Sequence, residues 1–447
     1  MDYIGRKIRL SVWLISSFLS RYKRQFAFAF IIGSLAVLAV WQFGERLYTT
    51  IVPPREYIGY VGQYEPTNLP RSIQEKISKG LVIVSTTGEV LPSLATAWEV
   101  NSDGTLYFFH LQKNQVWHDN EIFTAHDVNY QFTEVVIVPG DTHILKIELK
   151  EPFAPLPTLL SRPLFKTGLV GLGDYQVVSI ELKGNIVDRL IIQPVADGEG
   201  PIMDYRFYSS PSKAALAFQL GEVDRIENMP SVSELGDATN VRIEEMVQTD
   251  RFMALFFNLH HEAIKSKNFR QALSYATPVL SDKTVLSPIS QHSWAYNGSV
   301  KEYKYNIDLA RTLLQKVDTD TSAIQLILYT FPEYLDMAQQ ISDSWNSLGV
   351  ATEVKVAQTF PPDYDVFLGI QEIPSDPDQY PLWHSTQDRT NVTHYNNPKI
   401  DKLLEEGRRE IDRDKRLNLY LDFQRYLVED APAHFLYNPS IYTIIRR

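Results

Sequence analysis

The chain has 447 residues, of which 43 are Lys or Arg and 54 are Asp or Glu, so its formal net charge is −11. This length is ample for two or three domains or one large two-lobed body, and 44% hydrophobic with 22% charged residues is typical of a globular protein. The acidic balance argues against a nucleic-acid partner, because binding phosphates requires concentrated Lys and Arg. The absence of cysteine excludes disulfides, thiol catalysis and cysteine-bound metals.

Basic residues gather at the N-terminus. Residues 1–24 contain six Lys or Arg and only Asp2 as an acid, a net charge of +5. The next 19 residues, Gln25–Phe43, carry no charge. As a helix they would span about 28 Å, enough for the apolar core of a bilayer. By the positive-inside rule, the basic segment should face the cytoplasm and the acidic body should lie outside.

We therefore predict a cytoplasmic segment at 1–24, a transmembrane anchor at 25–43 and a tether at 44–57. A cleaved signal peptide is the alternative. The long basic stretch and the lack of a small-residue cleavage site after the apolar run favour the uncleaved anchor.

Strand and helix patterns alternate after the tether. Apolar and polar alternation predicts strands at 106–112, 144–149, 176–182 and 190–194. Helical spacing predicts helices at 125–133, 267–276, 307–317, 332–348 and 400–428, the first opened by a capping box at Thr124–Asp127 and the last breaking near Asp412. Interleaved strands and helices predict α/β lobes rather than a bundle or a sandwich.

Common catalytic motifs are missing from the sequence. There is no nucleophile elbow, no Walker A loop and no dinucleotide fingerprint, and residues 260–262 lack the spacing of a helical zinc site. A strand end, a turn and a capped helix explain His118 and His126 better than a metal site does. We therefore predict no enzyme activity, no cofactor and no metal. A hydrolase remains the alternative, because paired carboxylates such as Asp376 and Asp378 leave little trace in a sequence.

A series of short motifs runs along the chain in a fixed order. They occupy Leu91–Leu111, Val116–Val128, Gly171–Tyr175, Leu220–Asp224, Phe257–Ala276, Pro288–Asn297 and Tyr395–Pro432. Together these motifs resemble the extracellular solute-binding proteins of peptide ABC transporters, family 5, and the resemblance covers about residues 58–440.

The resemblance implies a two-lobed α/β fold, periplasmic-binding-protein-like (type II), whose lobes close on a ligand about a hinge. We expect lobe I at 58–245, rejoined by 433–447, and lobe II at 246–432. It also implies a monomeric receptor on the outer face of a bacterial cytoplasmic membrane, which passes short peptides or similar extended polar solutes to ABC permease subunits. The peptide backbone would bind as an added strand. A sensor or scaffold that signals through the single span is the alternative.

Two segments face the ligand cleft in proteins that this chain resembles. They supply the predicted ligand-binding residues Trp294, Tyr296, Asn297, Glu372, Asp376, Tyr380, Trp383 and Asn391. Core packing is the competing interpretation of each aromatic residue, and a solvated loop is that of Glu372.

The chain departs from the family at one residue that matters for ligand choice. Many peptide binders carry D-Y-x-D-P, whose first Asp pairs with the ligand's α-ammonium, and Ile373 holds that position here. Two interpretations follow: Glu372 or Asp376 substitutes for the missing carboxylate, or the ligand's free N-terminus is not recognised and the ligand class differs.

Overall fold

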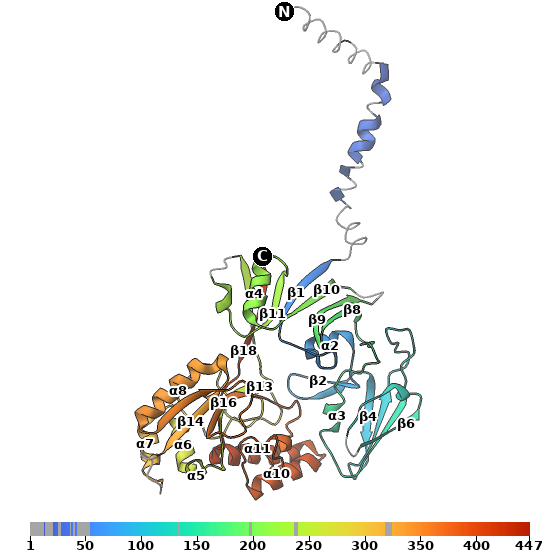
Figure 1. The fold of residues 1–447 in the computed structure, drawn as a ribbon. Coiled ribbons are helices and arrows are strands. Elements are labelled where there is room, and N and C mark those ends of the chain that lie inside the picture. The colour runs from blue at the N-terminus through green and yellow to red at the C-terminus, as the bar shows by residue number, and fades with distance from the viewer. Residues whose placement is uncertain are drawn as a thin grey trace, which may run out of the picture.

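The computed structural model describes residues 54–132, 135–195, 199–236, 240–317 and 324–447, together with Trp13, 21–25, 28–35, 37–38 and 41–42. The body consists of two lobes that lie side by side and meet at one end (Figure 1). Among the described residues, no helix combines the length and apolar character that crossing a membrane requires. Part of the predicted anchor, Gln25–Phe43, lies outside the described residues.

A seven-stranded sheet forms the first layer of lobe I. Its strands, in sheet order, are β12 (Val241–Val247), β18 (Ser440–Arg446), β11 (Arg225–Met229), β1 (Arg55–Val61), β10 (Ile202–Tyr208), β9 (Ile186–Pro194) and β8 (Tyr175–Lys183). Helix α2 (Arg71–Ile77) and helix α4 (Pro211–Gln219) cover opposite faces. Successive side chains of a strand point to opposite faces, so Ile58 of β1 packs with α2 whereas Val61 packs with α4.

A smaller four-stranded sheet completes lobe I. Its order is β4 (Ala95–Val100), β5 (Leu106–Leu111), β7 (Ile144–Leu149) and β6 (Val135–Asp141). Beside it lie the short hairpin of β2 (Val82–Val84) and β3 (Val90–Pro92), and helix α3 (Leu156–Leu159).

The predicted helix at 125–133 is wrong. The Thr124 N–H does donate to the Asp127 carboxylate at 2.7 Å, but the turn that follows is a single 3-10 turn, Ala125–Asp127. Val128, Tyr130 and Phe132 then alternate with more exposed residues and pack against the core under the four-stranded sheet. This spacing of two is that of an extended chain, and it outweighs the capping signal.

A five-stranded sheet forms the centre of lobe II. Its order is β15 (Ala351–Val356), β14 (Gln325–Thr330), β16 (Val366–Glu372), β13 (Arg251–Phe257) and β17 (Ala433–Tyr437). One face is covered by α6 (Lys267–Tyr275), α7 (Ile307–Leu314) and α8 (Leu335–Leu348), and the other by α10 (Pro398–Arg409) and α11 (Arg413–Asp430). Strand β13 is therefore buried on both sides, which explains its unbroken apolar sequence.

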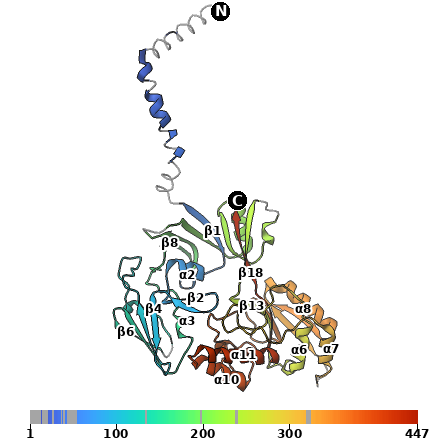
Figure 2. The ribbon, with the colours of Figure 1, turned by 180° about the vertical axis from the view of Figure 1, so that it is seen from behind.

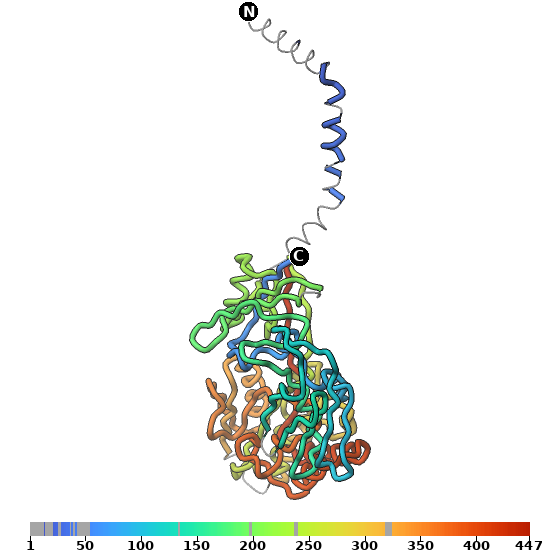
Figure 3. Tube along the Cα trace, turned by 90° about the vertical axis from the view of Figure 1, so that its right-hand side faces the viewer, coloured from blue at the N-terminus to red at the C-terminus, as the bar shows by residue number. Residues whose placement is uncertain are grey.

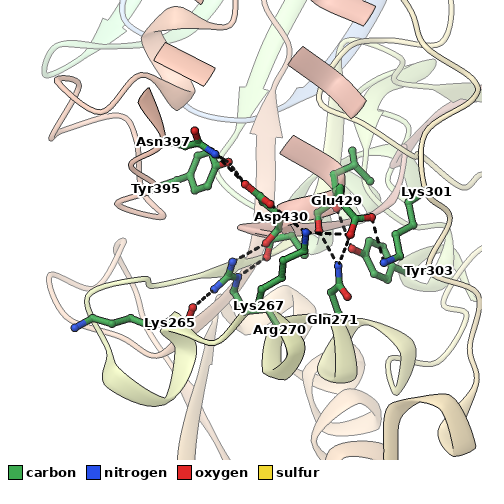
Figure 4. Close-up of polar contacts among 12 residues, drawn as sticks. Lys265, Lys267, Arg270, Gln271, Lys301, Tyr303, Tyr395, Asn397, Glu429 and Asp430 are labelled. Atoms are coloured by element: carbon green, nitrogen blue, oxygen red, sulfur yellow. Dashed lines mark hydrogen bonds and ion pairs between the residues drawn. The ribbon is translucent and has the colours of Figure 1, made fainter. Parts of the chain in front are cut away.

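Arg270 of α6 ties the two faces of lobe II together (Figure 4). Its side chain is 4% exposed and donates to the carbonyl groups of Asp430 at 2.6 Å and Ala431 at 2.9 Å, where α11 ends. It also donates to the carbonyls of Ile264 and Lys265, which end the short helix α5 (Glu262–Lys265), at 2.8 Å each. A cation at helix C-termini satisfies carbonyls that the helix itself leaves unbonded. The motifs at Phe257–Ala276 and Tyr395–Pro432 therefore contact each other through Arg270, and this contact stabilises the fold.

The chain passes between the lobes twice, and the two crossings lie against each other. Gln248–Asp250 joins β12 to β13, and Asn438–Pro439 joins β17 to β18. The Gln248 N–H donates to the Pro439 carbonyl at 2.8 Å, and the Asn438 side chain donates to the Arg251 carbonyl at 2.7 Å. In the view from behind, β18 of lobe I and β13 of lobe II lie next to each other where the lobes meet (Figure 2). This paired crossing has the geometry of a hinge.

The crossings correct one predicted boundary. Because β17 pairs with β13, residues 433–437 belong to the sheet of lobe II, and the chain rejoins lobe I at Ser440 rather than at residue 433. The start of β1 and the C-terminus lie at the same end of the body, opposite α10 and α11 (Figure 3).

Most predicted elements agree with the structure. The strand predicted at 144–149 has these bounds, and that predicted at 106–112 is one residue shorter. The helix predicted at 400–428 is broken as expected, since Asp412 caps α11 by accepting N–H bonds from Asp414 and Lys415.

Candidate functional site

A cavity of about 280 Å³ lies between the lobes, beside the crossings. All three parts of the fold contribute to its wall. Lobe I provides Arg71 and Glu75 of α2 with Val84, Ser85, Thr86 and Gly88 of the β2–β3 hairpin, the crossing provides Thr249 and Asp250, and lobe II provides Ile289, Ser290, Ser293, Ile373, Pro374, Ser375 and Pro377. A wall drawn from both lobes and the hinge is where ligand binding and lobe closure are coupled.

A second cavity of about 560 Å³ adjoins the first on the lobe I side. Arg71, Glu75 and Val84 line both, and the second continues over Lys79, Ser93, Gln112, Gln115 and Ser161. Together they offer a concave space in the size range of small-molecule sites, about 300–1,000 Å³. Their shared boundary consists of residues of α2 and β2.

Strand β2 presents an open edge to this space. In the described chain its single ladder partner is β3, and Ser85 donates its N–H to the Glu89 carbonyl at 2.8 Å. Hydrogen bonding alternates along an antiparallel pair, so Val84, one residue before Ser85, directs its N–H and C=O away from β3. An extended backbone lying in the cavities would find these groups free to pair.

The cavities carry two cations, Arg71 and Lys79, and two carboxylates, Glu75 and Asp250. The Arg71 Nε lies 2.6 Å from the Glu75 carboxylate, and its Nη2 donates to Ser161 Oγ at 3.2 Å. Asp250 has only a long contact, 3.4 Å, to Arg251. The lining of the two cavities therefore has no net charge. Arg71 compensates Glu75, Lys79 lies 3.0 Å from Asp174 outside the lining, and Asp250 keeps only its long contact.

Asp376, a predicted ligand carboxylate, belongs to a buried ion pair. Both of its oxygens accept from the Arg416 guanidinium, and the Nη1–Oδ2 distance is 2.9 Å. Thr158 of lobe I also lies 3.5 Å from it. With both side chains at most 10% exposed, this carboxylate has no room for a ligand, which corrects the prediction.

Tyr380 and its neighbours line a different cavity. Arg408 donates to Asp378 at 2.8 and 3.0 Å, and its guanidinium lies 4.0 Å from the Tyr380 ring centre and 5.3 Å from that of Phe153. Burial raises the pKa of Asp378, and Arg408 opposes that shift. The cavity here, about 460 Å³, lies between the four-stranded sheet and α10.

Two other predicted residues, Trp383 and Asn391, stabilise the segment that follows β16. Trp383 is 2% exposed and packs in the core against Phe435. The Asn391 side chain donates to the Tyr395 carbonyl at 2.8 Å and accepts from its N–H at 3.2 Å. Core packing is therefore the correct interpretation of Trp383, and Asn391 shapes the backbone rather than lining the cleft.

The predicted segment 294–297 lies where the lobes touch. The Trp294 N–H donates to the Thr87 carbonyl of lobe I at 3.0 Å, and its ring lies 5.2 Å from the Arg413 guanidinium. Asn297 donates to the Leu421 carbonyl at 2.8 Å and so fastens this loop to α11. Tyr296 is half-buried, and its burial raises its pKa. Among the described residues that line the two adjoining cavities, there is no Trp or Tyr.

The last predicted residue, Glu372, ends β16 with its side chain 78% exposed. It contacts Arg251 at 3.5 Å and stands next to Ile373, which does line the cavity.

Sequence reasoning missed Arg71, Glu75, Val84 and Asp250. The signal for Asp250 was available: it stands two residues before the apolar run 252–257 and close to the predicted lobe boundary at 245–246. Arg71 and Glu75 look like an ordinary exposed helix pair, so only the fold reveals their place.

The lobes also touch outside the cavities. Arg413 lies 2.9 Å from Glu89, and the Ala154 N–H donates to the Arg408 carbonyl at 2.9 Å. The structure therefore presents the two lobes closed against each other.

Replacing Arg416 with Met tests the assignment of Asp376 to structure. The substitution leaves a buried carboxylate without its cation, which should lower the free energy of unfolding by about 3–5 kcal/mol. Urea unfolding of the full chain measures this. Arg413→Met on the same helix is the control, because its exposed pair with Glu89 should contribute only about 0–1 kcal/mol. Equal effects of the two variants would contradict the assignment.

Comparison with known proteins supplies independent information. Residues 89–391 match the family model described as bacterial extracellular solute-binding proteins, family 5 Middle. The chain is 22% identical to the dipeptide-binding protein of Escherichia coli (strain K12), covering 81% of this chain and 83% of the relative. It is 23% identical to heme-binding protein A of Haemophilus influenzae, covering 82% of each.

Solved structures are similar over most of the chain. NikZ from Campylobacter jejuni, in complex with Ni(L-His), has a TM-score of 0.74 at 22% identity and covers 89% of this chain and 95% of its own. AppA from Bacillus subtilis, in complex with a nonapeptide, has a TM-score of 0.69 at 19% identity and covers 88% and 94%. At these identities the likeness shows the fold alone.

Proposed function

Because the chain belongs to the bacterial extracellular solute-binding proteins of family 5, we propose that it is the receptor of an ABC importer and binds short peptides or similar extended polar solutes between its lobes. The fold is that of type II periplasmic binding proteins, as the sequence predicted. The family consists of solute-binding proteins rather than enzymes.

The open edge of β2 is the observation that supports a peptide as the ligand. The relatives are named for dipeptides and heme, and the solved neighbours hold a nickel–histidine complex or a nonapeptide, so similarity does not select among ligands. A free strand edge at Val84, which lines both adjoining cavities, suits an extended backbone. Backbone pairing gives affinity for many side-chain sequences, which a nutrient receptor needs.

The remaining lining suits a polar ligand of varied sequence. Ser85, Thr86, Ser290, Ser293 and Ser375 offer hydroxyl groups around the first cavity. Small hydroxyl side chains leave space for bridging water, and such water adapts to different ligand side chains.

We also propose that Gln25–Phe43 anchors the receptor in the cytoplasmic membrane with its body outside the cell. The support is the net charge of +5 before an uncharged run of 19 residues. A tethered receptor stays close to the permease subunits that accept its ligand, and it works as a monomer.

Peptide binding is tested by calorimetry on the full chain in detergent, with dialanine, trialanine and tetraalanine. We expect at least one of them to bind. A matched ester, in which one backbone N–H is replaced by oxygen, should bind about 2- to 13-fold more weakly where that N–H pairs with β2.

The control is the ester at the next position, whose N–H points to the other side of an extended chain. Equal affinity of both esters and the parent peptide would rule out strand addition. Lack of binding by all three peptides would overturn the proposed function.

The anchor is tested by N-terminal sequencing of the protein from its native membranes. We expect the sequence to start at or near Met1 and the protein to stay in the membrane after an alkaline wash. A mature start near residue 44 would instead indicate a cleaved signal peptide.

A further inference from the structure

We propose that the anchored end of lobe I rests on the outer surface of the bilayer through Leu216 of helix α4 and Leu220, the residue that caps this helix. The inference rests on the proposed membrane anchor and goes beyond it, because an anchor alone does not specify which face of the body meets the lipid. The two cavities beside the crossings take no part in this contact.

Helix α4 carries apolar side chains on two opposite faces. Its inner face, with Ala214, Ala217 and Phe218, packs on the seven-stranded sheet. On its outer face the side chains of Leu216 and Leu220, one turn apart, are 55% and 67% exposed. A surface helix normally keeps its outer face polar, and a helix that is apolar on both faces is usually buried on both. The outer face of α4 therefore has the character of a contact surface.

The topology places these leucines at the end of the body where the anchor joins it. Strand β1 runs parallel to both β10 and β11, so all three strands start at the same end of the sheet. Helix α4 returns the chain from the end of β10 to the start of β11, and it therefore finishes near the start of β1. The Asp224 N–H, four residues after Leu220, donates to the Tyr57 carbonyl of β1 at 2.8 Å. Figure 1 accordingly shows α4 at the top of the body, near β1 and the C-terminus.

The length of the tether keeps this end close to the lipid. The predicted anchor ends at Phe43 and β1 begins at Arg55, so only residues 44–54 separate them. Even when fully extended, this segment spans at most about 40 Å. A contact through two leucines is weak for a protein that is free in solution, but the tether makes the contact intramolecular and so raises its effective concentration.

The charges near Leu220 favour the apolar part of the bilayer, rather than charged headgroups, as the source of attraction. Arg446 lies against α4, since it donates to the Phe218 carbonyl and its guanidinium lies 4.4 Å from the Phe218 ring centre. Glu222 and Asp224 stand directly after Leu220 and Gly221, so both signs of charge are present. We therefore expect the contact to depend little on salt.

The experiment uses the absence of cysteine from the chain. Leu216→Cys and Leu220→Cys, each carrying a nitroxide spin label, are introduced singly into the full chain, which is reconstituted in phosphatidylcholine vesicles. A label in contact with lipid gains accessibility to oxygen, which dissolves in the bilayer, and loses accessibility to a charged chromium oxalate complex, which stays in water. Both labels should report lipid, at low and at high salt alike.

Leu335→Cys on α8 of lobe II is the matched control, because this leucine is also exposed, at 41%, and belongs to the other lobe. Its label should report water. Adding Leu216→Glu to the Leu220→Cys protein should move that label into water, since a carboxylate on the outer face of α4 opposes burial in lipid. Melting curves of the labelled proteins confirm that each one is folded.

A label at Ser34→Cys, within the predicted anchor, separates the inference from the anchor on which it rests. Lipid around Ser34 with water around Leu216 and Leu220 overturns the contact and leaves the anchor standing. Water around Ser34 overturns both. A lipid signal that is equally strong at Leu335, or that survives Leu216→Glu, overturns the assignment to the leucines of α4.

Discussion

The hydrogen-bonded pair of crossings between the lobes is the constraint on which the site depends. Strands β12 and β18 are paired in one sheet, β13 and β17 in the other, and the crossings are bonded through Gln248 and Pro439. The two crossings are therefore coupled to each other, which is the arrangement expected of a hinge. The same arrangement sets Asp250 beside Ile373 and brings the β2–β3 hairpin opposite them.

Several charged side chains of lobe II stabilise the fold rather than line the cavity. Asp376 with Arg416 and Arg270 with four carbonyls are buried in lobe II, and the buried Asp378 pairs with the partly exposed Arg408. Such groups cost desolvation energy that is offset only while their partners stay in place. The pairs of Asp376 and Asp378 fasten the loop that follows β16 to α11 and α10, and residues 373–377 of that loop form part of the cavity wall. The charges left for the ligand are the few that the fold has not compensated.

Sequence patterns predicted the elements of this fold well and the site poorly. The periodic segments at 144–149, 267–276 and 400–428 became elements close to the expected bounds, since burial of one apolar face dominates each. The capping box at Thr124 failed because a capping signal spans only one turn, whereas packing of Tyr130 and Phe132 favoured an extended chain. The family motifs identify segments of the chain, but a motif does not tell which of its side chains faces the ligand.

The predicted aromatic residues show why the sequence did not identify the cavity lining. Trp383 packs in the core of lobe II and Trp294 lies against lobe I, because large apolar side chains gain more by packing than by facing an open cleft. The cavity is instead lined by residues with weak sequence signals, such as Ser375 and Val84, whose roles arise from backbone position. A free strand edge and a loosely paired Asp250 become visible only once the sheets are assembled.

Native mass spectrometry of the full chain, purified in mild detergent from its own membranes, tests the central claim most directly. The account predicts a bound short peptide that is absent from Ser375→Trp, a folded variant whose new side chain fills the cavity between the lobes. The same bound solute in both proteins, or a solute without a peptide backbone in the wild type, would contradict it.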